Sequence, residues 1–229
     1  MESLIQTVAI WALPVLFAIT VHEAAHGYVA RALGDTTAAM LGRLTLNPFK
    51  HIDPVGTVAV PLGLLVISAL TPAPAFVFGW AKPVPVNTRN LRRPQRDMAV
   101  VAAAGPLANL LMAVGWGLLI KFGLMWDHAF SQPMVYMGIA GIAINVLLMV
   151  LNLLPLPPLD GGRVVSGLLP PRIATRFDRI EPYGLPILLV LLITGVLGAI
   201  IGPVYSVISE SIGTVMGLLL RAYPMMQSP

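Results

Sequence analysis

The sequence predicts an all-α polytopic membrane protein, with about five to six transmembrane or re-entrant segments and a short β element at the cytoplasmic membrane face. Of its 229 residues, 57% are hydrophobic and only 10% are charged, whereas about a quarter of the residues in soluble domains are charged. The apolar residues form runs of about 20 residues, the length that a helix needs to cross a bilayer. Because polar residues form no long block, a single membrane-embedded domain is expected over residues 1–229.

Five apolar runs have the length of a membrane-spanning helix. They are Leu4–Ala32, Met98–Ile120, Met134–Leu154, Leu185–Ile201 and Val204–Leu220. The last two form a C-terminal helical pair (about 183–222) behind a motif-bearing core (about 1–163), and Gly202 and Pro203 are expected to separate them. The first run is flanked by Glu2 rather than by basic residues and has no convincing cleavage site, so we interpret it as a span rather than a signal peptide.

A sixth apolar stretch, Val55–Trp80, contains three prolines and is flanked by basic residues at both ends. It either crosses the membrane once or dips in and returns; irregular backbone at that depth is tolerated where protein or a water-filled cavity covers it. If it returns, every Lys and Arg except Lys121 lies on one face. The positive-inside rule then makes that face cytoplasmic and the N-terminus external.

Two polar stretches are expected to be non-helical. Partial alternation around Leu44, within Asp35–Lys50, predicts one or two short strands at the membrane face. The loop Gly79–Asp97 is expected to be extended, because its prolines disfavour helix on themselves and on the preceding residue. The net charge of +4 is explained by this sidedness, so no nucleic-acid partner is expected. The absence of cysteine excludes disulfides and leaves the redox compartment open.

The most informative motif is HEAAH, which places His22, Glu23 and His26 inside an apolar run. Residues four apart on a helix are separated by about 40° and about 6 Å, so both imidazoles can reach one metal ion. Glu23 points about 100° away from His22, where a carboxylate can take a proton from metal-bound water. Without a partner, a charged group near mid-membrane costs about 2.5–3.5 kcal/mol. Arg31 places the site about 13 Å inside the cytoplasmic face.

A catalytic zinc ion requires a third protein ligand and an open position. Asp160 follows a proline-rich segment that breaks a helix arriving from the external side, and Gly161 and Gly162 are expected to let the backbone turn sharply there. Asp160 can therefore lie at the depth of the histidines; the alternative is a loop cap or a partner for Arg163. We expect His51 to be structural rather than a ligand, and His128 is assigned no role.

Three motifs resemble those of the site-2 protease family of zinc intramembrane proteases: HEAAH (His22–His26), GPLAN (Gly105–Asn109) and NLLPLPPLDGGR (Asn152–Arg163). NPFKHIDPVGT and GWAKPVPVN are similar to the compact prokaryotic branch of that family, which lacks PDZ and CBS domains.

The resemblance implies one Zn²⁺ per chain, bound by His22, His26 and Asp160, with Glu23 as the catalytic residue. It also implies regulated intramembrane proteolysis, in which transmembrane segments of other proteins are cut near the cytoplasmic face of the cell (inner) membrane. The partners would be transmembrane protein substrates and the lipid bilayer; the oligomeric state is not predicted.

Other roles stay open. Asn109 and Asn152 could hold a histidine ligand or stabilise a developing oxyanion, or they could form ordinary interhelical hydrogen bonds, the only role assigned to Asn145. An unwound substrate could pair with the strand near Leu44 or with Val84–Val86. The competing functions are a metal-ion transporter, which would need a polar path through the external halves of the spans, and an inactive relative that binds membrane partners.

Overall fold

The computed structural model describes residues 2–60, 62–64, 66, 79–126 and 130–217, and these contain helices and loops but no strand. The long helices are α1 (Glu2–Ala32), α4 (Pro94–Met125), α5 (Ser131–Asn152) and α9 (Val196–Met216). The shorter helices are α2 (Thr37–Met40), α6 (Asp160–Leu168), α7 (Pro171–Asp178) and α8 (Gly184–Ile193). Single 3-10 turns are η1 (Pro48–Lys50), η3 (Thr88–Asn90) and η4 (Glu181–Tyr183), and η2 (Pro54–Ala59) is a short π-helix.

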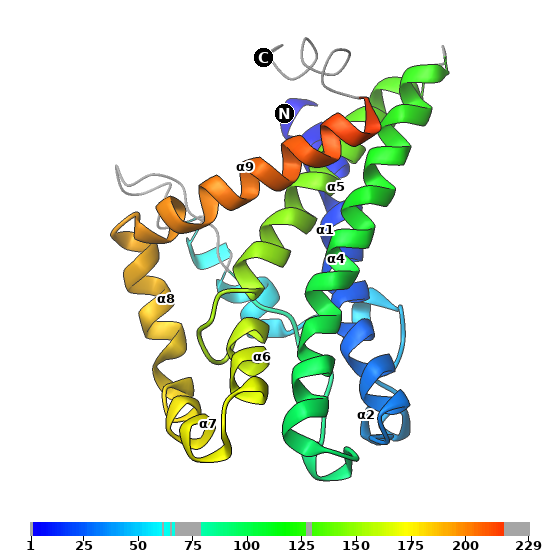
Figure 1. The fold of residues 1–229 in the computed structure, drawn as a ribbon. Coiled ribbons are helices and arrows are strands. Elements are labelled where there is room, and N and C mark those ends of the chain that lie inside the picture. The colour runs from blue at the N-terminus through cyan, green and yellow to red at the C-terminus, as the bar shows by residue number, and fades with distance from the viewer. Residues whose placement is uncertain (1, 61, 65, 67–78, 127–129, 218–229) are drawn as a thin grey trace.

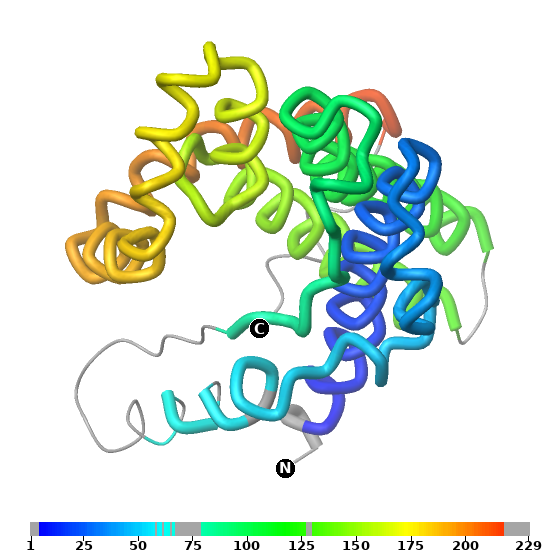
Figure 2. Tube along the Cα trace, turned by 90° about the horizontal axis from the view of Figure 1, so that it is seen from below, coloured from blue at the N-terminus to red at the C-terminus, as the bar shows by residue number. Residues whose placement is uncertain are grey.

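Helices α1, α4 and α5 form the centre of the molecule, with α6 packed against α4 and α9 against α5. Figure 1 shows α9 running obliquely across this group, and Figure 2 shows α7 and α8 to one side of it. The main apolar core joins α4, α5, α8 and α9 through residues such as Ala113, Val146, Leu188 and Leu197. The predicted spans Leu4–Ala32, Met98–Ile120 and Met134–Leu154 correspond closely to α1, α4 and α5.

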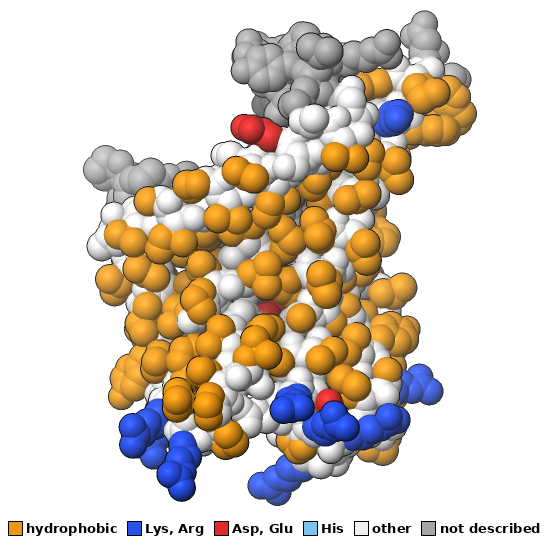
Figure 3. Space-filling model, viewed as in Figure 1, with side chains coloured by type: hydrophobic (Ala, Val, Ile, Leu, Met, Phe, Trp, Pro, Cys, Tyr) orange, Lys and Arg blue, Asp and Glu red, His pale blue; other side chains and the backbone are white. Residues whose placement is uncertain are grey.

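Four described helices, α1, α4, α5 and α9, are long and apolar enough to cross a membrane, so the expected number of five to six segments is not confirmed. The surface of the visible face is apolar over its middle. Lys and Arg side chains gather at the end that carries α2, α7 and the beginning of α4 (Figure 3). Lys121 lies near the other end of α4.

The predicted spans Leu185–Ile201 and Val204–Leu220 are wrong in their boundaries. The chain turns at Gly195, whose φ of 75° is left-handed, and α9 continues through Gly202 and Pro203. A residue with a left-handed φ turns the chain out of the helix and so ends it. A proline only removes one hydrogen bond, and membrane helices tolerate this loss. Helix α8 has 10 residues, about 15 Å, which is half the thickness of the hydrocarbon core.

The last helix also does not return to the basic end as expected. A Cβ atom added at Gly117 would lie 3.3 Å from Met216 Cγ, so the end of α9 lies beside the part of α4 that carries Lys121. Arg221, which was expected at the basic end, lies outside the described residues.

The stretch Val55–Trp80 lies largely outside the described residues, but its two ends are described. Trp80 N–H donates to Gly56 O at 3.1 Å, and Lys82 N–H donates to His51 O at 2.9 Å. The two described ends of this stretch therefore lie side by side. The choice between a single crossing and a segment that dips and returns falls on residues outside the described part of the chain.

The short strand expected near Leu44 is not formed. Helix α2 and a turn at Gly42, with φ 62°, occupy the first part of Asp35–Lys50, and η1 ends it. A strand needs a neighbouring strand for its backbone groups, and the described residues offer none. The loop Gly79–Asp97 was expected to be extended throughout, and this is correct only for residues 79–87. Its second half contains η3 (Thr88–Asn90) and the first turn of α4, which Pro94 can begin because a proline is tolerated at the start of a helix.

Candidate metal centre

Helix α1 presents the HEAAH motif to the centre of the molecule. His22 and His26 are 8% and 9% exposed, and both rings face α4 at Gly105. A Cβ atom at Gly105 would lie 2.5 Å from His22 Cε1 and 2.5 Å from His26 Nε2. Only glycine therefore leaves room for the two imidazoles at this position.

Asp160 enters the site as the first residue of α6, after the irregular segment that follows α5. Gly161 and Gly162 do not supply the sharp turn that was expected, because both are helical and neither has a positive φ. Instead, a side chain at Gly161 would overlap the Leu153 carbonyl, and one at Gly162 would overlap the backbone of Pro157. The two glycines let α6 pack tightly against the segment before it, and this brings Asp160 to the histidines.

The three predicted metal ligands converge. Asp160 Oδ2 lies 3.1 Å from His22 Nε2 and 3.4 Å from His26 Nε2, and the two Nε2 atoms are 3.1 Å apart. In the described part of the chain, these three residues form the one group of at least three side chains that could hold a metal ion.

The hydrogen bonds of the imidazoles define their protonation. His22 Nδ1–H donates to Asn109 Oδ1 at 2.6 Å, and His26 Nδ1–H donates to Val101 O at 2.7 Å. Since both partners are carbonyl oxygens, the neutral rings carry their protons on Nδ1 and direct the Nε2 lone pairs inward. Asp160 Oδ2 is also buried and receives no hydrogen bond within the described structure.

Three acceptor atoms that face one another without a proton require a cation. Tetrahedral zinc with bonds of about 2.0–2.2 Å places its ligand atoms about 3.3–3.6 Å apart, close to the separations observed. The set of two imidazoles and one carboxylate is also typical of catalytic zinc, which keeps a fourth position open. The residues present therefore fit a zinc ion.

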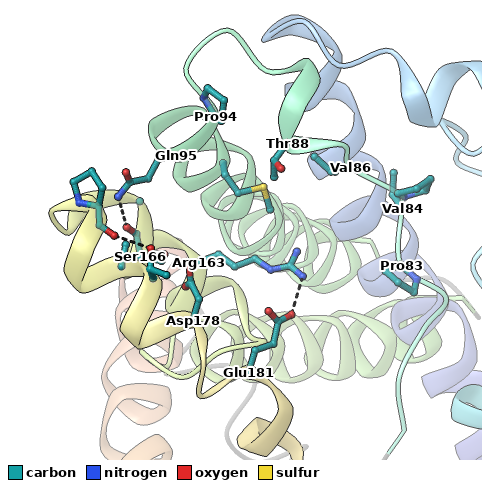
Figure 4. Close-up of a pocket in the computed structure, with 16 residues that line it drawn as sticks. Pro83, Val84, Val86, Thr88, Pro94, Gln95, Arg163, Ser166, Asp178 and Glu181 are labelled. Carbon is teal, nitrogen blue, oxygen red and sulfur yellow. Dashed lines mark hydrogen bonds and ion pairs between the residues drawn. The ribbon is translucent and has the colours of Figure 1, made fainter.

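Glu23 lies beside this group rather than in it. Its Oε2 accepts a hydrogen bond of 2.7 Å from Val84 N–H, in the extended loop before α4. Val84 also lines a cleft of about 650 Å³ between residues 83–88, the beginning of α4, α6 and α7 (Figure 4). Arg163 and Glu181 face each other in this cleft at 3.9 Å (Figure 4), so Arg163 pairs with Glu181 and not with Asp160.

The asparagines have different surroundings. Asn109 is fully buried, and beyond His22 its Nδ2 donates to Ala18 O at 3.3 Å and to Asn145 Oδ1 at 2.9 Å. Asn145 makes the interhelical hydrogen bond expected of it, and its own Nδ2 donates to Gly141 O. Asn152 donates to Leu148 O within its own helix.

His51 is buried and its Nε2 bonds to Thr45 O at 2.9 Å, outside the metal-ligating group, whereas His128 lies outside the described residues. The sequence assigned no role to Gly105 or Val101, and it gave Val84 only a possible role in pairing with an extended substrate. The GPLAN motif contains Gly105 and could have indicated it. The Val101 carbonyl and the Val84 amide could not be found in this way, because residue type does not show which backbone groups bond to a side chain.

These features define the class of protein. It is an apolar helical protein with a buried site that fits catalytic zinc and a carboxylate beside that site, as in a membrane metalloprotease. Residues 118–195 match the model of peptidase family M50, a range that contains Asp160 but not HEAAH. A Bacillus subtilis protein named "Putative zinc metalloprotease YwhC" is 38% identical over 201 residues, which are 86% of this chain and 86% of that protein.

A Mycolicibacterium smegmatis protein named "Putative zinc metalloprotease Rip2" is 31% identical over 183 residues, which are 78% of this chain and 64% of that protein. No solved structure matches the chain. The chain belongs to peptidase family M50, the site-2 protease family, and is a multi-pass membrane zinc metalloprotease.

Proposed function

We propose that this protein is an intramembrane protease that hydrolyses peptide bonds within or near transmembrane segments of other proteins. The observation that carries the proposal is that His22 and His26, on the membrane-length helix α1, converge with Asp160 at the beginning of α6. A site at this depth meets substrates that are themselves embedded in the bilayer.

The chemistry follows from the residues around the group. Zinc held by His22, His26 and Asp160 would polarise the scissile carbonyl and acidify a bound water. Glu23 takes a proton from the attacking water and then passes it to the leaving amine. Asn109 and the Val101 carbonyl hold the two imidazoles in the tautomer that ligates metal.

The proposed orientation places the basic end in the cytoplasm and the N-terminus outside, in the cell (inner) membrane. The Lys and Arg side chains at one end of the molecule (Figure 3) support it, because cytoplasmic loops carry the excess of basic residues. The active site then lies towards the cytoplasmic face, and the cleft lined by Val84 lies at the same end of the molecule. A transporter is not supported, since the described residues hold one metal-ligating group and no second site for transit.

The test is cleavage in reconstituted vesicles. The zinc-loaded protein should cut a model transmembrane substrate inside or at the edge of its apolar segment, as mass spectrometry of the products would show. Equal cleavage of a soluble peptide of the same extramembrane sequence, with the transmembrane segment left intact, would contradict the proposal.

A further inference from the structure

The extended segment Lys82–Asn87 runs beside α1 and is fixed at both ends. At its beginning, Lys82 N–H donates to His51 O at 2.9 Å, and Arg43 Nη2 donates to Lys82 O at 3.0 Å and to Pro83 O at 3.2 Å. At its end, Asn87 N–H donates to the buried carboxylate of Asp35 at 2.7 Å. A short segment held in this way has little freedom to move along the helix.

The middle of the segment touches the catalytic machinery. Val84 N–H donates to Glu23 Oε2 at 2.7 Å, and the Val84 side chain lies over Gly27, one turn further along α1. A Cβ atom at Gly27 would lie 3.0 Å from Val84 Cγ1. Because Gly27 has no side chain, the segment can come close enough to α1 for the Val84 amide to reach Glu23.

The sequence of the segment makes this amide distinctive. Pro83 and Pro85 have no N–H group, so between Lys82 and Asn87 only Val84 and Val86 can donate a backbone hydrogen bond. Because the Val84 donor is engaged by Glu23, it is not free to pair with an extended substrate.

We propose that the Val84 amide is the positioning group for Glu23. It holds Oε2 and leaves Oε1 to take the proton from the attacking water. Once Glu23 is protonated, Oε2 still accepts the amide hydrogen bond, so the proton stays on Oε1 until it moves to the leaving amine. The same bond keeps the Glu23 carboxylate beside the group of His22, His26 and Asp160 and not within it. This inference rests on the proposed function, which requires that Glu23 be held in place, and it assigns that task to the Val84 amide.

Three substitutions separate the amide from the side chain. Val84→Pro removes the N–H, and its backbone is compatible with proline because residues before a proline are already extended. Val84→Ala keeps the N–H and removes most of the side chain, while Val86→Pro removes the neighbouring N–H that does not bond to Glu23. We expect Val84→Pro to lower kcat about ten- to a hundredfold with KM and zinc content unchanged. Val84→Ala and Val86→Pro both keep the Val84 N–H, so each should lose clearly less kcat than Val84→Pro.

Wild-type kcat in Val84→Pro would overturn the proposal, and so would equal losses in Val84→Ala or Val86→Pro. Should Val84→Pro fail to fold or to bind zinc, the α-hydroxy analogue of valine at position 84 replaces N–H by an ester oxygen with no change of side chain. Its kcat must then show the loss. Absence of cleavage by zinc-loaded wild type would contradict the proposed function, whereas full cleavage by Val84→Pro contradicts only the role of its amide.

Discussion

Each imidazole of the metal centre depends on a partner that only accepts a hydrogen bond. For His22 the partner is Asn109 Oδ1, and for His26 it is the Val101 carbonyl. The Asn109 amide is itself oriented by Ala18 O and Asn145 Oδ1, so its oxygen must face His22. A neutral imidazole with a fixed Nδ1 proton is the better metal ligand.

This orientation makes Asn109 the more important of the two predicted asparagines. Asn109→Ala removes the acceptor of His22 and is expected to weaken zinc binding about ten- to a hundredfold. Asn152→Ala is the control, because its amide bonds to Leu148 O in the same helix. Competition with a zinc chelator measures both affinities, and equal weakening in the two variants would contradict the role of Asn109.

Asp35, beyond the end of α1, gives the folded state a pH dependence. Burial raises the pKa of its carboxyl, but hydrogen bonds from Thr37, Asn90 and Asn87 outweigh burial and hold the pKa below its usual range. A carboxyl with a lowered pKa stabilises the folded state above the unfolded pKa of about 3.9, and this contribution is lost as pH falls through the folded pKa.

The expected result is a higher Tm for wild type than for Asp35→Asn at pH 7, with a difference that shrinks as pH falls below about 4. Thermal unfolding in detergent at several pH values measures it. Asp178→Asn, which changes an exposed carboxylate at the end of α7, is the control and should alter Tm little. A Tm difference for Asp35→Asn that persists unchanged to pH 3 would contradict this interpretation.

At the residue scale, the sequence predicted those parts of the site that depend on side-chain type. HEAAH has helical spacing that brings two imidazoles to one ion, and the family resemblance pointed to Asp160. The Val101 carbonyl and the Val84 amide could not be predicted, because every residue carries a carbonyl and almost every residue carries an amide. Their importance comes from packing between segments that are 75 and 61 residues apart in the chain.

Among the elements, α4 supplies the hydrogen-bond acceptors of both imidazoles and also leaves space for the two rings at Gly105. Gly105 leaves space for both histidines, since a Cβ atom there would lie 2.5 Å from His26 Nε2. Gly105→Ala is therefore expected to abolish stoichiometric zinc binding and cleavage. Gly115→Ala, on the same helix with no atom of the described residues within 4 Å of its Cβ position, should retain both. Normal zinc content in Gly105→Ala would contradict this expectation, because α1 and α4 would then be able to move apart without loss of the site.

Element boundaries were predicted well where apolar runs end in polar sequence and poorly where two breakers compete. Helices α1, α4 and α5 lie where they were expected, but the turn between α8 and α9 lies at Gly195 rather than at Gly202–Pro203. A glycine can adopt a left-handed φ or continue a helix, and tertiary packing selects between the two. The alternation near Leu44 likewise predicts a strand only if a partner strand is available, and the described chain supplies none.

For the whole molecule, the distribution of charge predicts its orientation in the membrane. The chain has no cysteine, so single cysteines report sidedness without background. Arg172→Cys, at the beginning of α7, should be labelled from the cytoplasm by a membrane-impermeant maleimide, and Lys121→Cys, near the end of α4, only from outside. The reverse pattern would place the active site towards the opposite face.

The central claim is that His22, His26 and Asp160 bind one zinc ion and that Glu23 performs the proton transfers. The most direct measurement is zinc content beside cleavage of a transmembrane substrate, for wild type, Glu23→Gln and Asp160→Ala. We predict one zinc in wild type and Glu23→Gln, reduced zinc in Asp160→Ala, and cleavage by wild type alone, with a loss of at least a hundredfold in Glu23→Gln. Full zinc in Asp160→Ala, or undiminished cleavage by Glu23→Gln, would contradict the account.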